Sequence, residues 1–128
     1  MYDLSKKRIP FSEESISRLQ TLRSRIIIKE NNILCRIGFC LSLEEPGHPT
    51  FPENLDGSPI DRYTLLGAHE KTFIALLVTW MQKNGYDNIT SENLTECFIA
   101  HMDRGAQIVS SRIKSMTDFA QLVPGAIS

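Results

Sequence analysis

The fold is decided by two stretches of sequence, KKRIPF at residues 6–11 and NILCRIGFCL at residues 32–41. The first has the composition of a short basic strand, and it leads into an amphipathic helix. The second contains a single charged residue, Arg36, and is apolar on nearly every face of a helix. Such a helix must be covered on several sides. In so short a chain, we expect part of that cover to come from a second copy of the protein.

The helix between these stretches is predicted to begin after Ser12, whose hydroxyl suits an N-cap. Its apolar residues recur at helical spacing and form one stripe made of Ile16, Leu19, Leu22, Ile26 and Ile27. At about 100° per residue, Arg18, Arg25 and Lys29 fall beside that stripe. The sequence therefore predicts a basic edge along the first helix.

Strand, helix, turn and apolar helix over residues 6–45 is the order of a ribbon-helix-helix, or Met repressor-like, unit. We therefore predict a mainly α-helical, oligomeric fold with this unit at its N-terminal end. Gly38 costs about 1 kcal/mol of helix propensity, so it is expected where another backbone packs closely. The residues predicted to lie at the oligomer interface are Ile37, Phe39 and Leu41.

The chain is too short to build two cores and is expected to form a single domain. Its predicted parts are the strand-helix-helix unit (6–45), a loop rich in proline and glycine (46–62), a short strand with two helices (63–112) and a tail (113–128). The strand is expected at residues 62–66 and the helices at 68–84 and from Thr90 or Ser91 onward. The tail lacks a long periodic pattern, which predicts a short helix or turn at most.

The formal net charge is −1, so the chain has no global basic field of the kind that marks many nucleic-acid-binding proteins. Any DNA binding must come from local cations, and the candidates are Lys6, Lys7, Arg8, Arg18, Arg25 and Lys29. An ordinary solvated face is the alternative. Assembly into a symmetric oligomer would repeat the patch, and roughly six to ten phosphate contacts give strongly salt-dependent binding.

The sequence lacks the motifs of common active sites and metal centres, such as a phosphate-binding loop or HExxH. We therefore expect no enzyme activity, no catalytic residues, no cofactor and no metal. His101 falls on an apolar helix stripe and is predicted to be structural or interfacial. Three cysteines, Cys35, Cys40 and Cys97, are predicted to be buried, reduced thiols of a cytoplasmic protein. No apolar run is long enough for a membrane span, and no signal peptide is expected.

Residues 32–46, NILCRIGFCLSLEEP, resemble the second helix of DndE, the E component of the bacterial DNA phosphorothioation (Dnd) system. The residues 9–12, IPFS, and 101–105, HMDRG, add to the resemblance, although Asp103 stands where the family has a histidine. The resemblance covers roughly residues 8–110. It implies a small Met repressor-like protein that forms an oligomer, expected to be a homotetramer. It also implies binding to duplex DNA and association with the sulfur-insertion and ATPase subunits of the Dnd complex.

Three functions remain open at this stage. The first is an accessory DNA-binding subunit of the phosphorothioation complex that grips intact or nicked duplex DNA through the sugar-phosphate backbone. The second is a sequence-reading ribbon-helix-helix repressor, which would read bases with alternate side chains of the strand, although Pro10 interrupts that strand. The third is an assembly adaptor that leaves DNA contact to its partners.

Overall fold

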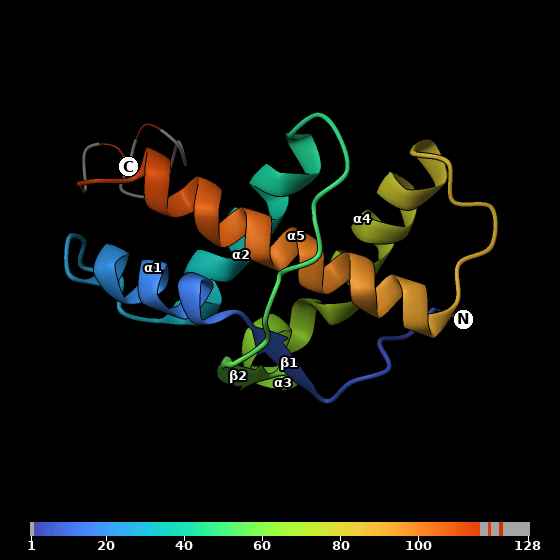
Figure 1. The fold of residues 1–128 in the computed structure, drawn as a ribbon, viewed down its shortest axis with the longest axis horizontal. Coiled ribbons are helices and arrows are strands. Elements are labelled where there is room, and N and C mark those ends of the chain that lie inside the picture. The colour runs from blue at the N-terminus through green and yellow to red at the C-terminus, as the bar shows by residue number, and fades with distance from the viewer. Residues whose placement is uncertain (1, 116–117, 119–120, 122–128) are drawn as a thin grey trace.

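The computed structural model describes residues 2–115, 118 and 121, and within them the fold is mainly helical with a small two-stranded sheet (Figure 1). The elements in chain order are β1 (Arg8–Phe11), α1 (Glu13–Arg23), α2 (Asn31–Glu44), β2 (Gly57–Asp61), α3 (Arg62–Leu66), a 3₁₀ turn η1 (Gly67–His69), α4 (Glu70–Lys83) and α5 (Ser91–Arg112). The long helix α5 runs along the molecule and contacts α2, α1 and β1. Ile113 caps α5, whereas most of the predicted tail lies outside the described residues.

The strand β1 pairs antiparallel with β2 of the same chain, with Ile9 opposite Ile60 and Phe11 opposite Gly57. The predicted ribbon-helix-helix unit was expected to need a partner chain to complete its core, whereas the structure completes the strand pairing within one chain. The loop prediction for 46–62 is correspondingly wrong over β2. Gly57 allows the two strands and α1 to meet, because a Cβ at this position would lie 2.5 Å from the carbonyl oxygen of Ser12.

Residues 62–66 form the helix α3, and the prediction of a strand there is wrong. The reason lies one residue earlier, because the carboxylate of Asp61 accepts hydrogen bonds from the backbone N–H groups of Tyr63 and Thr64. This N-cap starts a helix in spite of the β-branched and aromatic content of the segment. The later helices α4 and α5 lie where the sequence predicts them. Thr90 and Asn93 form a reciprocal capping box at the start of α5.

Helix α1 ends earlier than its apolar stripe suggests, at Arg23, with Ser24 as the C-cap. The predicted basic edge of one long helix is therefore wrong, because Arg25 and Lys29 lie in the connection to α2. Ile26 is nonetheless buried, at 3% exposure, and joins the core from that connection. The stripe thus marks burial correctly at Leu19, Leu22 and Ile26 but fails at Ile27, which is exposed, and it does not mark the length of the helix.

Helix α2 is covered mainly by α5 of its own chain, and the two helices cross with backbone contact at Gly38 and Gly105. A Cβ on Gly38 would lie 2.6 Å from the carbonyl oxygen of Gly105. The prediction of close backbone packing at Gly38 is confirmed, with α5 as the neighbour. Phe39 is fully buried in the core and contacts Phe73 and Phe98, so it is not available to a second copy and its assignment to an interface is corrected.

Ile37 and Leu41 are partly buried and pack against the same core, which leaves part of each at the surface of α2. Within the described residues, no helix is both long enough and apolar enough to cross a membrane.

Candidate nucleic-acid interface

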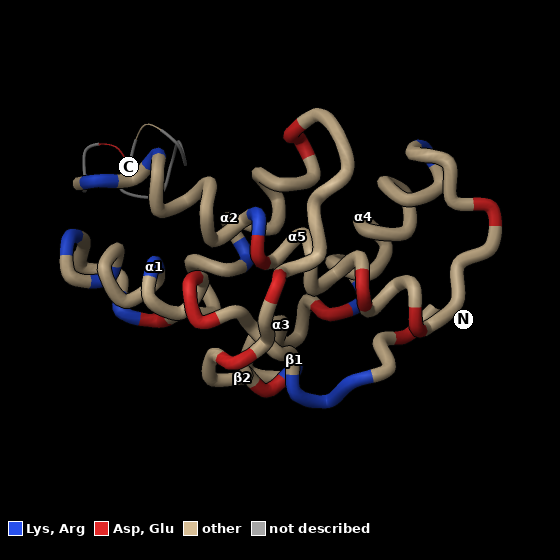
Figure 2. Tube along the Cα trace, in the orientation of Figure 1, with Lys and Arg blue, Asp and Glu red and all other residues tan. Residues whose placement is uncertain are grey.

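The predicted cations Lys6, Lys7 and Arg8 lie together on the segment that leads into β1, and all three are exposed. Within the described residues, their side chains make no ion pair or hydrogen bond. We call residues 6–8 the basic arm. In Figure 2 it forms a continuous blue stretch below the sheet.

The basic arm is held to the body of the protein by its backbone. Arg62 donates from Nη1 to the carbonyl oxygen of Leu4 (3.0 Å), and its backbone N–H donates to the carbonyl oxygen of Lys7 (2.7 Å). The backbone N–H of Ser5 donates to Oγ1 of Thr95 on α5 (2.8 Å). Because the backbone is anchored, less conformational entropy would be lost if these cationic side chains bound an anionic ligand.

Arg8 differs from the two lysines because Asp61 stands opposite it in the β1–β2 ladder. The acidic neighbour reduces the positive field around Arg8, although no ion pair forms between the two side chains. Lys6 and Lys7 precede the ladder and have no such neighbour across a strand.

The other predicted cations lie around α1 and its connection to α2. Arg18 is 3.7 Å from Glu14 one turn earlier on α1, a partly exposed pair of small energetic value. Arg25 is exposed. Lys29 donates from Nζ to the carbonyl oxygens of Arg23 (2.7 Å) and Ile26 (2.9 Å), so its ammonium closes the end of α1.

The structure therefore divides the six predicted cations into two groups, with the basic arm near the sheet and the remainder toward the far end of α1. Acidic residues lie between the two groups along the molecule (Figure 2). In a single chain they do not form one continuous track. The two groups are therefore separate candidate contact sites, and a single chain would have to touch one duplex at two places to use both.

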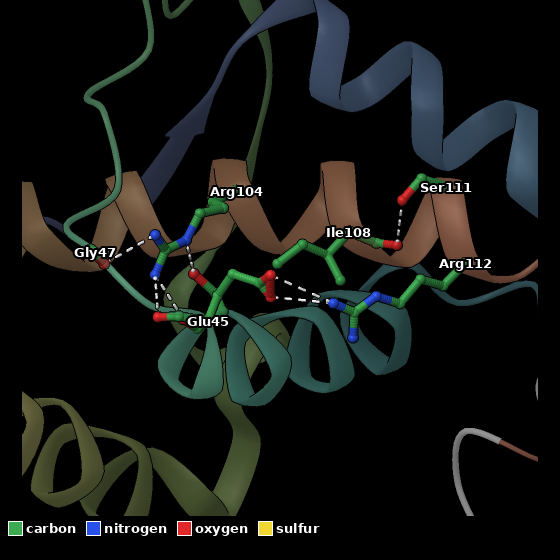
Figure 3. A network of polar contacts seen from close by, with 7 residues as sticks. Glu45, Gly47, Arg104, Ile108, Ser111 and Arg112 are labelled. Atoms are coloured by element: carbon green, nitrogen blue, oxygen red, sulfur yellow. Dashed lines mark hydrogen bonds and ion pairs between the residues drawn. The ribbon is translucent and has the colours of Figure 1, made fainter.

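Two arginines of α5, Arg104 and Arg112, had no predicted role, and the structure shows that they bind the C-terminal end of α2. Arg104 of α5 donates from Nε to Oγ of Ser42 (2.9 Å) and from its terminal nitrogens to the carbonyl oxygens of Ser42 (2.6 Å) and Gly47 (3.0 Å) (Figure 3). These bonds satisfy carbonyls at the C-terminal end of α2, which a helix leaves without internal partners. Next to it, Arg112 pairs with the carboxylate of Glu45 at 3.0 Å.

Asp103 ties α5 to the start of α1. Its carboxylate accepts hydrogen bonds from the hydroxyls of Ser12 (2.8 Å) and Ser15. Ser12 in turn accepts from the backbone N–H of Ser15, as predicted for an N-cap. A negative charge near the N-terminus of a helix is favourable, so Asp103 stabilises α1 from another element. A histidine here could not reproduce that charge.

His101 is completely buried between α2, α4 and α5. Its Nδ1 is 2.8 Å from Oγ of Ser42, and its ring meets Trp80 edge to face at 4.4 Å. Burial, together with the nearby positive charge of Arg104, lowers the pKa of His101 to about 3. The imidazole is therefore neutral at physiological pH. Its contacts are those of a core residue, in keeping with the predicted structural role.

The side chains that could hold a metal ion and the three thiols are spread over the described part of the chain. No three histidine, cysteine, aspartate or glutamate side chains in that part come close enough to hold a metal ion. Burial raises the pKa of the Cys35 thiol to about 12 and that of Cys97 to about 11. Cys40 is exposed on α2, which corrects the prediction that all three thiols are buried.

Comparisons with known proteins give a consistent result. The family model described as "DNA sulphur modification protein DndE" matches residues 8–117. The fold is similar to a crystal structure of DndE from Escherichia coli B7A involved in DNA phosphorothioation modification (TM-score 0.66, 22% identity, 84% of this chain and 99% of that chain). It is also similar to a DndE G21/24K mutant structure (TM-score 0.61, 23% identity, 83% and 98%). No curated protein matches the chain. Because the family model spans most of the sequence, the chain belongs to the DndE family of DNA sulphur modification proteins.

Proposed function

We propose that this protein is an accessory, non-catalytic DNA-binding subunit of the phosphorothioation complex, and that it grips duplex DNA through the sugar-phosphate backbone. The observation that carries the proposal is the basic arm, whose exposed cations lie on an anchored backbone in a member of the DndE family. Phosphorothioation replaces a phosphate oxygen by sulfur. A subunit that holds the backbone, intact or nicked, would place the reacting phosphate for its partners.

The arrangement of β1 favours backbone contact over sequence reading. Of its four residues, Ile9 and Phe11 are buried, which leaves only Arg8 and Pro10 toward the surface. A ribbon-helix-helix repressor needs several outward side chains that match base edges, and proline offers no hydrogen bond donor for that purpose. The alternative of a sequence-reading repressor is therefore less well supported by this strand.

The proposal includes assembly in the cytoplasm as a homotetramer and association with the sulfur-insertion and ATPase subunits. Exposed apolar side chains on three elements are available for such contacts: Ile33 (37% exposed), Tyr63 (76%) and Leu76 (43%). Ile37 and Leu41 remain candidates for a contact between copies. Several copies would also multiply the basic arms presented to one duplex.

The test is a salt titration of DNA binding by fluorescence anisotropy, with random-sequence duplexes that are intact or nicked. We expect the triple substitution Lys6→Gln, Lys7→Gln and Arg8→Gln to weaken binding to every duplex alike. The slope of log K against log salt should fall by about one unit for each phosphate contact removed. Light scattering on the same samples gives the number of copies bound.

A matched control removes three exposed lysines elsewhere, with Lys71→Gln, Lys83→Gln and Lys114→Gln. This variant has the same net charge as the triple substitution in the basic arm and should retain the wild-type slope. Equal losses in the two variants would mean that net charge alone acts. No salt-dependent binding by the wild-type protein would instead favour the adaptor function.

A further inference from the structure

Ile27 is a large apolar side chain that the fold leaves 74% exposed, in the connection between α1 and α2. It is flanked two residues away on each side by Arg25 and Lys29. An isolated exposed apolar residue is common on protein surfaces. Ile27 differs from such residues because the connection between α1 and α2 holds it in place between Arg25 and Lys29.

The neighbours of Ile27 hold it outward. Ile26 is buried at 3% exposure, and Ile28 packs against the same core. The side chain between these two anchors therefore points away from the core. Hydrogen bonds in both directions close the segment, because Lys29 Nζ donates to the carbonyl oxygen of Arg23 (2.7 Å) and Arg23 Nη1 donates to that of Lys29 (3.4 Å).

We propose that Ile27 is an apolar wedge that contacts the faces of DNA bases at an opened base step, while Arg25 contacts a flanking phosphate. The inference rests on the proposed DNA binding and adds to it a residue that acts on base stacking. Architectural DNA-binding proteins insert isoleucine, leucine or phenylalanine between base steps in the same manner and thereby partly unstack them. The closed segment would deliver the wedge already ordered, which limits the entropy lost on binding.

Charge favours DNA as the occupant of this surface. Residues 23–30 carry three cations, Arg23, Arg25 and Lys29, against one acid, Glu30. Arg23 and Lys29 donate hydrogen bonds to carbonyl oxygens within this segment, so Arg25 is the cation that remains for a phosphate. Two residues span at most about 7 Å, and phosphates of one strand recur every 3.4 Å or so along the helix axis. Arg25 can therefore contact the phosphate next to the step that Ile27 enters.

The test uses the full chain and duplexes that carry 2-aminopurine, whose fluorescence rises when it unstacks, either within an intact duplex or beside a nick. We expect wild-type protein to raise the fluorescence at one or both sites. Ile27→Ser should lower the rise at saturation by at least half and weaken binding on the order of tenfold. It should leave the salt slope unchanged, because no phosphate contact is lost.

Two variants sharpen the test. Phe51→Ser removes another exposed apolar side chain, in the loop between α2 and β2, and should retain both the fluorescence rise and the affinity. Arg25→Gln should reduce the salt slope by about one unit and keep the fluorescence rise at saturation. Thermal unfolding of each variant confirms that the fold is intact, which is expected because the substituted side chains are exposed.

The outcomes separate the wedge from DNA binding itself. Wild-type affinity and fluorescence in Ile27→Ser would overturn the wedge and leave the proposed function standing. No fluorescence rise with bound wild-type protein would overturn it in the same way. A change in oligomer mass in Ile27→Ser, seen by light scattering, would assign Ile27 to a contact between copies. No DNA binding by wild-type protein would overturn both proposals.

Discussion

Arginine has opposite roles in two regions of the molecule. One region is the crossing of α2 and α5, and the other is the connection between α1 and α2. At the crossing, Arg104 is bound by the hydroxyl of Ser42 and by carbonyls at the end of α2. In the connection, Arg25 is exposed, and its side chain makes no hydrogen bond or ion pair within the described residues. One guanidinium completes the fold, and the other remains available to a ligand.

The difference comes from what surrounds each arginine and not from the residue type. A helix ends with carbonyl groups that need donors. Arg104 reaches the end of α2 because Gly38 and Gly105 bring the two helices into backbone contact. At the end of α1, the ammonium of Lys29 already donates to the carbonyls. A cation that is a candidate for ligand binding is therefore recognised here by the absence of an internal acceptor among the described residues, which only the folded chain reveals.

The largest expected effect follows from breaking the crossing itself. Gly105→Leu places a side chain where a Cβ alone would lie 2.5 Å from the backbone of Gly38, so the helices must separate. We expect a loss of about 3 kcal/mol or more in the free energy of unfolding, measured by urea denaturation with circular dichroism. Ala75→Leu on the exposed face of α4 adds a similar volume and should change stability by less than about 0.5 kcal/mol. Equal stability of the two variants would contradict the close contact.

The next effect compares the two arginines directly. Arg104→Gln leaves carbonyls at the end of α2 without their donor, and we expect a loss of about 2 kcal/mol in the free energy of unfolding. Arg25→Gln should cost less than about 0.5 kcal/mol, because no internal bond is lost. The loss of DNA affinity should be larger in Arg25→Gln than in Arg104→Gln, which is the reverse of the order for stability. If the two substitutions had the same effect on stability, the contrast between the regions would be lost.

The smallest expected effect is a dependence of stability on pH that arises at the crossing. The folded protein holds the pKa of His101 at about 3, against 6.5 for the ordinary side chain. Below pH 6.5 the unfolded chain binds a proton that the folded chain does not, so stability is full above this value and falls as the pH falls toward 3. The expected loss is about 1.4 kcal/mol between pH 7.5 and 5.5.

Urea denaturation across this range measures the loss. His101→Gln should flatten the dependence. An unchanged slope in His101→Gln would show that another group is responsible for the acid sensitivity.

The apolar patterns predicted much of the helical fold. Stripes placed α4 and α5 correctly, with the start of α5 expected at Thr90 or Ser91. Ser12 was predicted as an N-cap, and Gly38 was predicted to lie against another backbone. Periodicity failed at two points. It extended α1 through Ile26 and Ile27, although the helix ends at Arg23, because apolar residues in the connection happen to continue the helical spacing. It also assigned residues 62–66 to a strand, because the β-branched and aromatic residues were considered without the N-cap that Asp61 provides to α3.

The candidate interface was predicted only in part. The charge run at residues 6–8 is local in sequence and therefore remains together in the fold. Arg18, Arg25 and Lys29 were grouped by helical spacing, and the end of α1 at Arg23 separates them. The exposure of Ile27 and the anchoring of the arm through Arg62 depend on contacts distant in sequence, which spacing could not reveal.

The sequence by itself determined the family, the helical class and the near absence of net charge, because these follow from residue identities and their local periodicity. The tertiary structure alone decided that β1 pairs within its own chain and that α5 covers α2. It also decided which cations remain free. These features depend on contacts between residues far apart in the sequence, such as Gly38 with Gly105 and Arg104 with Ser42. Local spacing cannot show which distant residue each of them will meet.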